Sequence, residues 1–274
     1  MRDRVQVAGV EFDNVNEMEA VKKIHELMSY GEPFYVVTPN PEFVLEAQKN
    51  ESFKTILNQA ALTIPDGIGI IWAASFLSRP QSLLFSLFKL LVCPQSVKTV
   101  LKARVAGTDL MEKIVAESET TGWKIFLLGA REGIAEAAKN NLQKKYPRAV
   151  FAGCFAGDGN EQGDFKTVAA IQATQPDIVF VAYGAPKQEQ WIHRNLCELP
   201  SVKMAMGVGG AFDFMSGKKQ RAPRIIQAIG LEWLWRLLRE PRRLPRIWRA
   251  TISFIRLIHL EAKKSCHKSK KTIP

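Results

Sequence analysis

Residues 177–189 read DIVFVAYGAPKQE, and this stretch decides the fold class. The run Asp177–Gly184 is short, apolar and rich in β-branched residues, which is typical of a buried strand. The helical pattern Pro186–Leu196 follows at once. A strand that leads directly into a helix is the repeating unit of a parallel sheet, because parallel strands need a long crossover connection.

The same alternation extends outward in both directions along the chain. Further strand patterns lie at Phe34–Thr38, Ala61–Ile64, Lys124–Gly129 and Val202–Gly207. Helical patterns lie between them at Asn40–Lys49, Gly67–Phe76, Thr108–Thr121, Glu132–Lys145 and Phe165–Gln175. The segment Val5–Val10 alternates apolar and polar residues, as an edge strand or a hairpin does. The sequence therefore predicts an α/β fold with a doubly wound, mostly parallel sheet and helices on both faces.

The charge of this 274-residue chain is divided unevenly. Residues 1–216 hold 22 Lys and Arg against 24 Asp and Glu, a net charge of −2, whereas residues 217–274 hold 16 against three, a net charge of +13. A basic block of this kind usually meets a polyanion such as nucleic acid, anionic lipid or a phosphorylated substrate. We expect a catalytic domain over residues 1–217 and a basic appendage over residues 218–274.

The appendage also carries an amphipathic pattern. Gly230–Arg239 places two Trp and four Leu among charged residues, and a second apolar set follows helical spacing at Ile247, Trp248, Thr251, Phe254, Ile255 and Ile258. Basic amphipathic helices bind in the membrane interface, and Leu83–Val92 is a second segment of suitable composition. The alternative is a helix that packs on the body with its charges solvated. The asymmetry of charge and the Trp content favour membrane docking.

The location of the protein follows from what the sequence lacks. The opening residues have no apolar signal core, and no apolar stretch has the length needed to span a bilayer. The four cysteines are far apart and have no His at ligand spacing, which favours reduced thiols over disulfides or a zinc site. We expect a cytoplasmic protein that binds peripherally to a membrane surface.

Five loops that follow strands carry turn or helix-cap residues. They are Thr38–Pro41, Pro65–Gly67, Gly129–Arg131, Gly184–Glu189 and Gly207–Gly210. Open α/β sheets bind ligands beyond the carboxyl ends of their strands, where such loops converge. The sequence therefore predicts one site built from these loops.

Asp66 is the candidate base of this site. It ends an apolar strand beside Ile64 and Ile68, where partial desolvation would raise the pKa of its carboxyl group and suit it to accept a proton. The alternative is an N-cap for the following helix, which the tripeptide taken alone slightly favours. Thr38 and Asn40 lie beside prolines that stiffen the backbone, and for them the alternative is an ordinary turn and cap.

The sequence lacks the common phosphate-binding motifs. There is no GxGxxG fingerprint, no Walker A motif and no Asp-x-Asp pair, so nicotinamide binding, P-loop chemistry and a metal-held diphosphate are disfavoured. We expect no cofactor and no metal. A leaving diphosphate must then be neutralised by Arg, Lys or backbone N–H groups, with Arg104 and the tail arginines as candidates.

The ordered motifs resemble a known family. Thr38-Pro39-Asn40-Pro41, Pro65-Asp66-Gly67, Gly184–Glu189, Gly207–Asp213 and Arg221–Pro223 followed by Gly230–Arg236 occur in the order found in the WecG/TagA/CpsF family of bacterial glycosyltransferases. The resemblance implies inverting, metal-independent transfer from a UDP-sugar, often UDP-N-acetylmannosamine, to a polyprenyl-diphosphate-linked saccharide. Such reactions belong to cell-surface polysaccharide or teichoic acid biosynthesis.

The resemblance also implies residue roles. Asp66 resembles the base, and Thr38 and Asn40 resemble residues of the donor-sugar pocket. The other matching positions are Arg104 near the diphosphate, Gln188 and Asp213 at the nucleotide, Gly209 and Gly210 in the substrate-binding loop, and the appendage arginines Arg236, Arg243 and Arg246. The chain departs from the family in a longer Leu/Phe-rich insert between Trp72 and Arg104 and in a tail that continues beyond about residue 250.

Two rival functions use the same features. A nucleic-acid-binding protein would use the +13 tail, although the wide apolar stripe of the tail disfavours it. A nicotinamide-dependent oxidoreductase would use the same fold but lacks its fingerprint. Self-association into a homo-oligomer is possible, and no nucleic acid is expected as a partner under the favoured interpretation.

Overall fold

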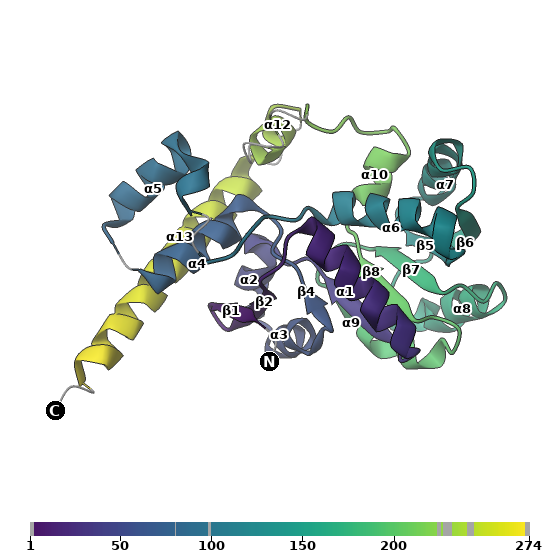
Figure 1. Cartoon of the computed structure of the whole chain (residues 1–274), viewed down its shortest axis with the longest axis horizontal. Coiled ribbons are helices and arrows are strands. Elements are labelled where there is room, and N and C mark those ends of the chain that lie inside the picture. Colours follow the sequence, from purple (N-terminus) through teal and green to yellow (C-terminus); the bar gives the residue numbers. More distant parts are fainter. Residues whose placement is uncertain are drawn as a thin grey trace.

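The computed structural model describes residues 3–79, 81–97, 100–223, 226, 232–239 and 244–271. Its centre is a six-stranded sheet in the order β4-β3-β8-β7-β5-β6, and every neighbouring pair is parallel (Figure 1). The strands are β3 (Phe34–Val37), β4 (Leu62–Thr63), β5 (Lys124–Gly129), β6 (Val150–Phe155), β7 (Ile178–Ala182) and β8 (Met204–Gly207). The α/β fold predicted from the sequence is confirmed.

Strand β7 lies inside the sheet, between β5 and β8. Phe180 is in register with Leu127 on one side and Met206 on the other, and all five residues of β7 are buried. A strand that is covered on both faces needs apolar side chains at every position. This requirement explains why the run Ile178–Ala182 is continuously apolar.

Helices cover both faces of the sheet. One face carries α1 (Glu17–Tyr30), α6 (Gly107–Thr121), α7 (Ile134–Lys145) and α10 (Ala211–Met215), whose apolar residues form one buried cluster with Ile125 and Leu127. The opposite face carries α8 (Glu161–Gln172) and α9 (Lys187–Asn195), followed by the short helix η2 (Leu196–Glu198), and packs Trp191 against alternate residues of the same strands. The alternation of side chains along each strand produces the two cores.

A third cluster lies beside the sheet and joins segments that are distant in sequence. It contains α2 (Pro41–Ala47), α3 (Glu51–Gln59), α4 (Ile68–Ser78) and the hairpin of β1 (Arg4–Val7) and β2 (Val10–Asp13). Of the two predicted alternatives, edge strand or hairpin, the structure shows the hairpin, and Val5–Val10 covers most of β1, the turn and the first residue of β2. The buried carboxylate of Asp13 accepts a hydrogen bond from Thr63 N at 2.9 Å, which fixes the hairpin to β4.

The sequence prediction missed the strand β6, the helices α1 and α3 and the five-residue helix α10. Strand β6 is an edge strand, and an added Cβ at Gly153 would lie 2.9 Å from the Phe126 ring. The close packing of this ring requires glycine, and glycine interrupts the apolar pattern by which strands are found. The edge position also leaves the outer side of β6 without a neighbouring strand.

The tail folds back onto the body. Helix α13 (Leu244–Lys271) packs against α2 and α4, and Phe254, Ile258 and Ala262 are buried in the third cluster (Figure 1). These residues of the tail helix therefore pack on the body, which was the alternative to membrane docking. Trp248 and Ile252 of the same helix stay exposed. Helix α12 (Glu232–Arg239) precedes α13. The division at residue 217 stays a prediction.

Helix α5 (Leu83–Val92) and the short helix η1 (Pro94–Val97) form the insert between Trp72 and Arg104, next to α4. Across the described parts of the chain, no helix combines the length and the apolarity that a membrane crossing requires.

Candidate active site

Three loops are joined by backbone hydrogen bonds at the carboxyl ends of β3 and β4. Asp66 N donates to Pro39 O at 3.1 Å, and Val105 N donates to Pro65 O at 3.0 Å. The loop of Thr38 and Asn40 therefore lies beside the loop of Asp66, and the latter lies beside the segment of Arg104. The structure thus brings these four sequence-predicted residues onto adjoining loops. Their individual roles stay predictions.

Asp66 is half-buried, and it is not the cap of the next helix. The N-cap of α4 is Gly67, with a φ of 99° and no side-chain hydrogen bond to the helix. A residue with a Cβ is strained at this φ, so the turn that presents Asp66 requires glycine. Gly67 rather than Asp66 therefore occupies the N-cap position of α4, and the role of the Asp66 carboxylate stays a prediction.

Thr38 is buried against the start of α6. An added Cβ at Gly107 would lie 2.8 Å from Thr38 Oγ1, so only glycine allows this approach. The hydroxyl group thus sits at the N-terminus of a 15-residue helix, where unpaired N–H groups favour an anion. In the first turn of the same helix, the Asp109 carboxylate forms a bidentate ion pair with Arg221, with Nη2–Oδ2 at 2.8 Å.

Asn40 has two roles. Its Oδ1 accepts hydrogen bonds from Glu42 N at 2.9 Å and Phe43 N at 3.3 Å, so it caps α2, as the cap alternative predicted. Its side chain also lines a pocket. The cap holds the side chain in one orientation, so a group of fixed direction faces the pocket.

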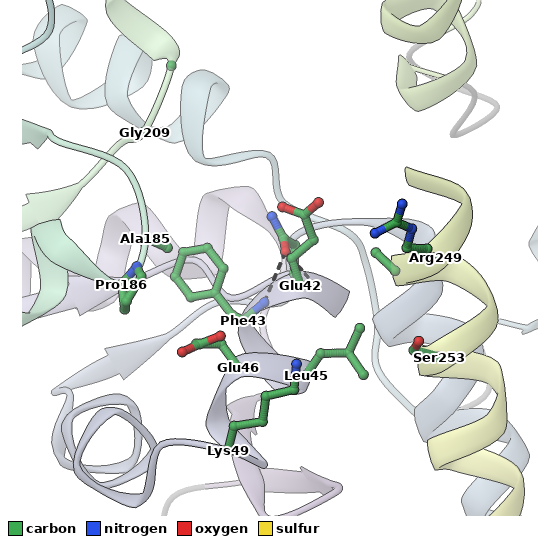
Figure 2. A pocket seen from close by; sticks show the side chains of 13 residues that line it. Glu42, Phe43, Leu45, Glu46, Lys49, Ala185, Pro186, Gly209, Arg249 and Ser253 are labelled. Atoms are coloured by element: carbon green, nitrogen blue, oxygen red, sulfur yellow. Dashed lines mark hydrogen bonds between the residues drawn. The ribbon is translucent and has the colours of Figure 1, made fainter. Parts of the chain in front are cut away.

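The pocket has a volume of about 550 Å³ and lies between α2, the loop after β7, the loop after β8 and α13 (Figure 2). Its lining residues are Asn40, Glu42, Phe43, Leu45, Glu46, Lys49, Ala185, Pro186, Gly209, Gly210, Arg249, Ala250 and Ser253. An added Cβ at Gly209 or Gly210 would meet nothing within 4 Å, so this backbone is open to a ligand. Asp66, Thr38 and Arg104 are not among the lining residues but lie on the adjoining loops.

Gln188 links two of the glycine loops. Its side chain is 2% exposed, and its Oε1 accepts hydrogen bonds from Gly184 N at 3.0 Å and from Gly209 N at 2.9 Å. Its Nε2 donates to Glu189 Oε1 at 2.6 Å. The structure therefore gives Gln188 a positioning role on the pocket wall, and the predicted contact with a nucleotide stays a prediction.

Glu189 is fully buried next to Gln188. Burial raises the pKa of its carboxyl group to about 8, because removal from water disfavours the charged form. Its Oε2 makes no hydrogen bond within the described structure. The sequence shows Glu189 only as the third polar residue after a strand and a turn, so neither its burial nor its raised pKa was foreseeable.

Asp213 lies in α10, directly after Gly209 and Gly210. Its carboxylate forms an ion pair with Lys219 at 2.8 Å, and its backbone oxygen accepts a hydrogen bond from Lys219 N. This pairing positions Asp213 near the open glycine backbone, and its predicted nucleotide contact is a prediction still.

The tail contributes three residues to the pocket, of which the sequence indicated Arg249 only as one of the tail arginines and did not indicate Ala250 or Ser253. Arg249, Ala250 and Ser253 of α13 form one wall, and Figure 2 shows Arg249 extending towards the side of α2 that carries Glu42. A signal existed in the helical spacing, since Arg249 lies three residues after the family-matching Arg246. The side chains of Arg236 and Arg246, and all of Arg243, lie outside the described residues.

The protein is an open, doubly wound α/β protein with a pocket beyond the carboxyl ends of its strands, which is where proteins of this class bind their ligands. The model of the family described as "Glycosyl transferase WecG/TagA/CpsF family" matches residues 5–93 and 88–268. The chain belongs to this family, as the ordered motifs predicted.

Curated relatives of known name support the same assignment. The chain is 31% identical over 271 residues to an N-acetylglucosaminyldiphosphoundecaprenol N-acetyl-beta-D-mannosaminyltransferase of Staphylococcus aureus strain MRSA252, covering 97% of this chain and 96% of the relative. It is also 31% identical over 269 residues to the protein of the same name from strain MW2, with the same coverage. The similarity therefore includes the body and the tail.

Proposed function

We propose that the protein is an inverting, metal-independent glycosyltransferase that transfers a hexose from a UDP-sugar to a polyprenyl-diphosphate-linked saccharide. N-acetylmannosamine or a related sugar is the favoured donor group, since the relatives are named for transfer of N-acetylmannosamine to an N-acetylglucosaminyl-diphosphoundecaprenol acceptor. The product belongs to a cell-surface polysaccharide or teichoic acid pathway.

The observation that carries this proposal is the joining of three loops around Asp66. Its loop is hydrogen-bonded to the loop of Thr38 and Asn40 on one side and to the segment of Arg104 on the other. In the proposed reaction, the Asp66 carboxylate takes the proton of the acceptor hydroxyl while the hydroxyl oxygen attacks the anomeric carbon. The bond to the UDP oxygen breaks on the opposite face, so the configuration inverts in one displacement.

The departing UDP carries negative charge that the site must stabilise. The N–H groups at the start of α6, beside Thr38, and the open backbone at Gly210 offer donors to phosphate oxygens, whereas Gly209 N is already bonded to Gln188. Arg104 supplies a cation on the adjoining segment. The 550 Å³ pocket lies within the about 300–1,000 Å³ typical of small-molecule sites, and Arg249 adds a cation from α13.

The tail connects this chemistry to the membrane. Its net charge of +13 attracts an anionic leaflet, where each basic residue contributes on the order of 1 kcal/mol. Because α13 also forms a wall of the pocket, the tail both docks the protein and completes its site. We therefore propose a peripheral location on the inner face of the cell membrane. The nucleic-acid alternative is disfavoured by the family to which the chain belongs, whose description is that of glycosyl transferases.

The test is to offer UDP-N-acetylmannosamine and other UDP-sugars with a lipid-linked N-acetylglucosaminyl diphosphate and to measure released UDP. We expect release that depends on acceptor and equals the disaccharide formed, and NMR of the product should show the inverted anomeric configuration. UDP release without acceptor, or retention of configuration, would contradict the proposal.

A further inference from the structure

Helix α5 has two apolar faces, and within the described residues only one of them packs on the rest of the fold. Its inner face places Leu83, Leu87 and Leu90 against the third cluster, and its Ser86 Oγ accepts a hydrogen bond from Trp72 Nε1 of α4 at 2.8 Å. Ser86 and Trp72 are both buried, so α5 is firmly attached to α4.

The outer face of α5 is exposed and equally apolar. The exposed fractions are 80% for Leu84, 51% for Phe85, 60% for Phe88 and 66% for Val92. These positions are one, three or four residues apart, so the side chains form one continuous patch. Exposing a continuous patch of Leu and Phe side chains to water is unfavourable, and soluble proteins seldom do so unless the patch is a binding surface.

The charge around this patch identifies its partner. No acidic residue occurs between Asp66 and Asp109, whereas the same interval holds Arg79, Lys89, Lys98, Lys102 and Arg104. Lys89 Nζ lies over the Phe85 ring at 4.5 Å from its centroid, so a cation accompanies the apolar face. Of the other basic residues in this interval, Lys102 is paired with Glu19 of α1 at 2.8 Å. Exposed Leu and Phe side chains on a segment that has no acidic residue of its own, with Lys89 beside them, match the interface of an anionic bilayer, where apolar groups enter the acyl boundary and cations meet lipid phosphates.

We propose that α5 is a second membrane-docking element, which inserts Leu84, Phe85, Phe88 and Val92 into the interface of an anionic bilayer. A second copy of the chain fits less well, because a stable dimer needs about 800 Å² from each partner and one face of a ten-residue helix provides less. Both α5 and α13 pack next to α4, at the end of the molecule opposite α7 and α8 (Figure 1). The two docking elements are therefore neighbours.

Because α5 is attached to α4, insertion of α5 into a bilayer would also position the Asp66 loop that precedes α4. Trp72, which holds Ser86, lies about 6 Å along the helix axis from the first residue of α4 at a rise of about 1.5 Å per residue. That first turn follows Asp66 and Gly67. Insertion of α5 thus sets the Asp66 loop at a fixed height above the bilayer, where a lipid-linked acceptor presents its diphosphate. This consequence rests on the proposed function, whereas the docking itself does not.

The experiment compares the full-length protein with its Leu84→Glu/Phe88→Glu variant in co-sedimentation with vesicles of phosphatidylglycerol and phosphatidylethanolamine. We expect at least about tenfold weaker binding for the variant, because both side chains would leave the acyl boundary. The matched control is Phe165→Glu in α8, which changes an 84% exposed aromatic residue away from α5 and should bind as the parent does. Equal binding of parent and double variant would overturn the proposal.

A second measurement reads insertion directly. A polarity-sensitive fluorophore on Leu84→Cys, with the four native cysteines replaced by serine, should shift its emission to the blue on addition of the anionic vesicles. No shift, or a shift without lipid that tracks dimer formation in light scattering, would overturn the proposal in favour of a protein interface.

Activity separates this inference from the proposed function. The double variant should keep parental turnover with a water-soluble acceptor analogue and lose it on vesicle-borne acceptor. If the parent has no turnover with either acceptor, the proposed function fails, while the vesicle comparison still decides the role of α5.

Discussion

The buried carboxyl group of Glu189 accepts a hydrogen bond from the side-chain amide of Gln188 at 2.6 Å. This bond orients the amide so that Gln188 Oε1 faces Gly184 N and Gly209 N, which both donate to it. If the amide were rotated by 180°, its NH2 group would face the donating N–H groups of Gly184 and Gly209. Its oxygen would then face the accepting Oε1 of Glu189, so both sets of hydrogen bonds would be lost. The pair thus joins the loops after β7 and β8, two walls of the pocket.

The first prediction concerns the pH dependence of stability. Burial raises the pKa of Glu189 to about 8 in the folded protein, against about 4.5 in the unfolded chain. Between these values the folded state binds the extra proton, so the free energy of unfolding falls as pH rises, by up to about 1.4 kcal/mol per pH unit, and levels off above about 8. Glu189→Gln keeps an acceptor for Gln188 and should remove this slope. Urea unfolding from pH 5 to 9 measures it, and parallel curves for both proteins would refute the assignment.

Removal of the bridging amide should loosen the pocket wall. Gln188→Ala leaves the partly buried Gly184 N and Gly209 N without their acceptor, at a cost of at most about 1–3 kcal/mol each, the scale for a fully buried group. We expect a lower urea midpoint and a raised KM for the donor. Gln190→Ala, two residues on in the same helix, is the control and should change neither value. A Gln188→Ala variant with parental KM would show that the bridge does not position the loop.

Loss of the proposed base should reduce turnover. Asp66→Asn preserves the size of the side chain but cannot accept the acceptor proton, so kcat should fall by about 10²–10⁴ with little change in the KM for the donor. The matched control is Asp158→Asn, an exposed carboxylate in the loop after β6. UDP release measures both variants, and full turnover by Asp66→Asn would exclude the base.

Two exposed arginines of α13, Arg249 and Arg256, provide a matched pair. Arg249 lines the pocket, whereas Arg256 lies seven residues later on the same side of the helix and does not line it. Arg249→Ala should raise the KM for the donor by about tenfold, the scale of one lost charge-assisted contact. Arg256→Ala should leave KM unchanged while weakening vesicle binding as much as Arg249→Ala does. Equal kinetic effects would show that the tail charges act only through the membrane.

Metal independence is also testable. The site proposed here stabilises the leaving diphosphate with Arg104, backbone N–H groups and Arg249, so a chelator should not reduce turnover. Activity is compared in EDTA and in added Mg²⁺ or Mn²⁺ at constant ionic strength. Loss of activity in EDTA that a divalent cation restores would require a different account of the leaving group.

Patterns confined to single segments were readable from the sequence. The continuous apolar run Ile178–Ala182 and its alternation with helices predicted the parallel sheet, because a strand covered on both faces must be apolar throughout. The parallel sheet in turn predicted that the loops of Thr38, Asp66 and Gly209 lie at one edge, because parallel strands all end at the same edge of the sheet. The motif order then predicted the family that the comparisons confirm.

Only the tertiary structure decided which partners these segments meet. Edge strand β6 escaped prediction because the Phe126 ring demands Gly153 in a neighbouring strand. The burial of Glu189, and its bond to Gln188, arise where α9 closes against Gly207 of β8, a contact between segments separated in sequence. Likewise, α13 lies beside the pocket because Phe254 packs near Gly69 of α4, and this position makes Arg249 a lining residue. The sequence determines the period and chemistry of each element, whereas desolvation and pocket geometry depend on contacts between distant elements, which no local pattern encodes.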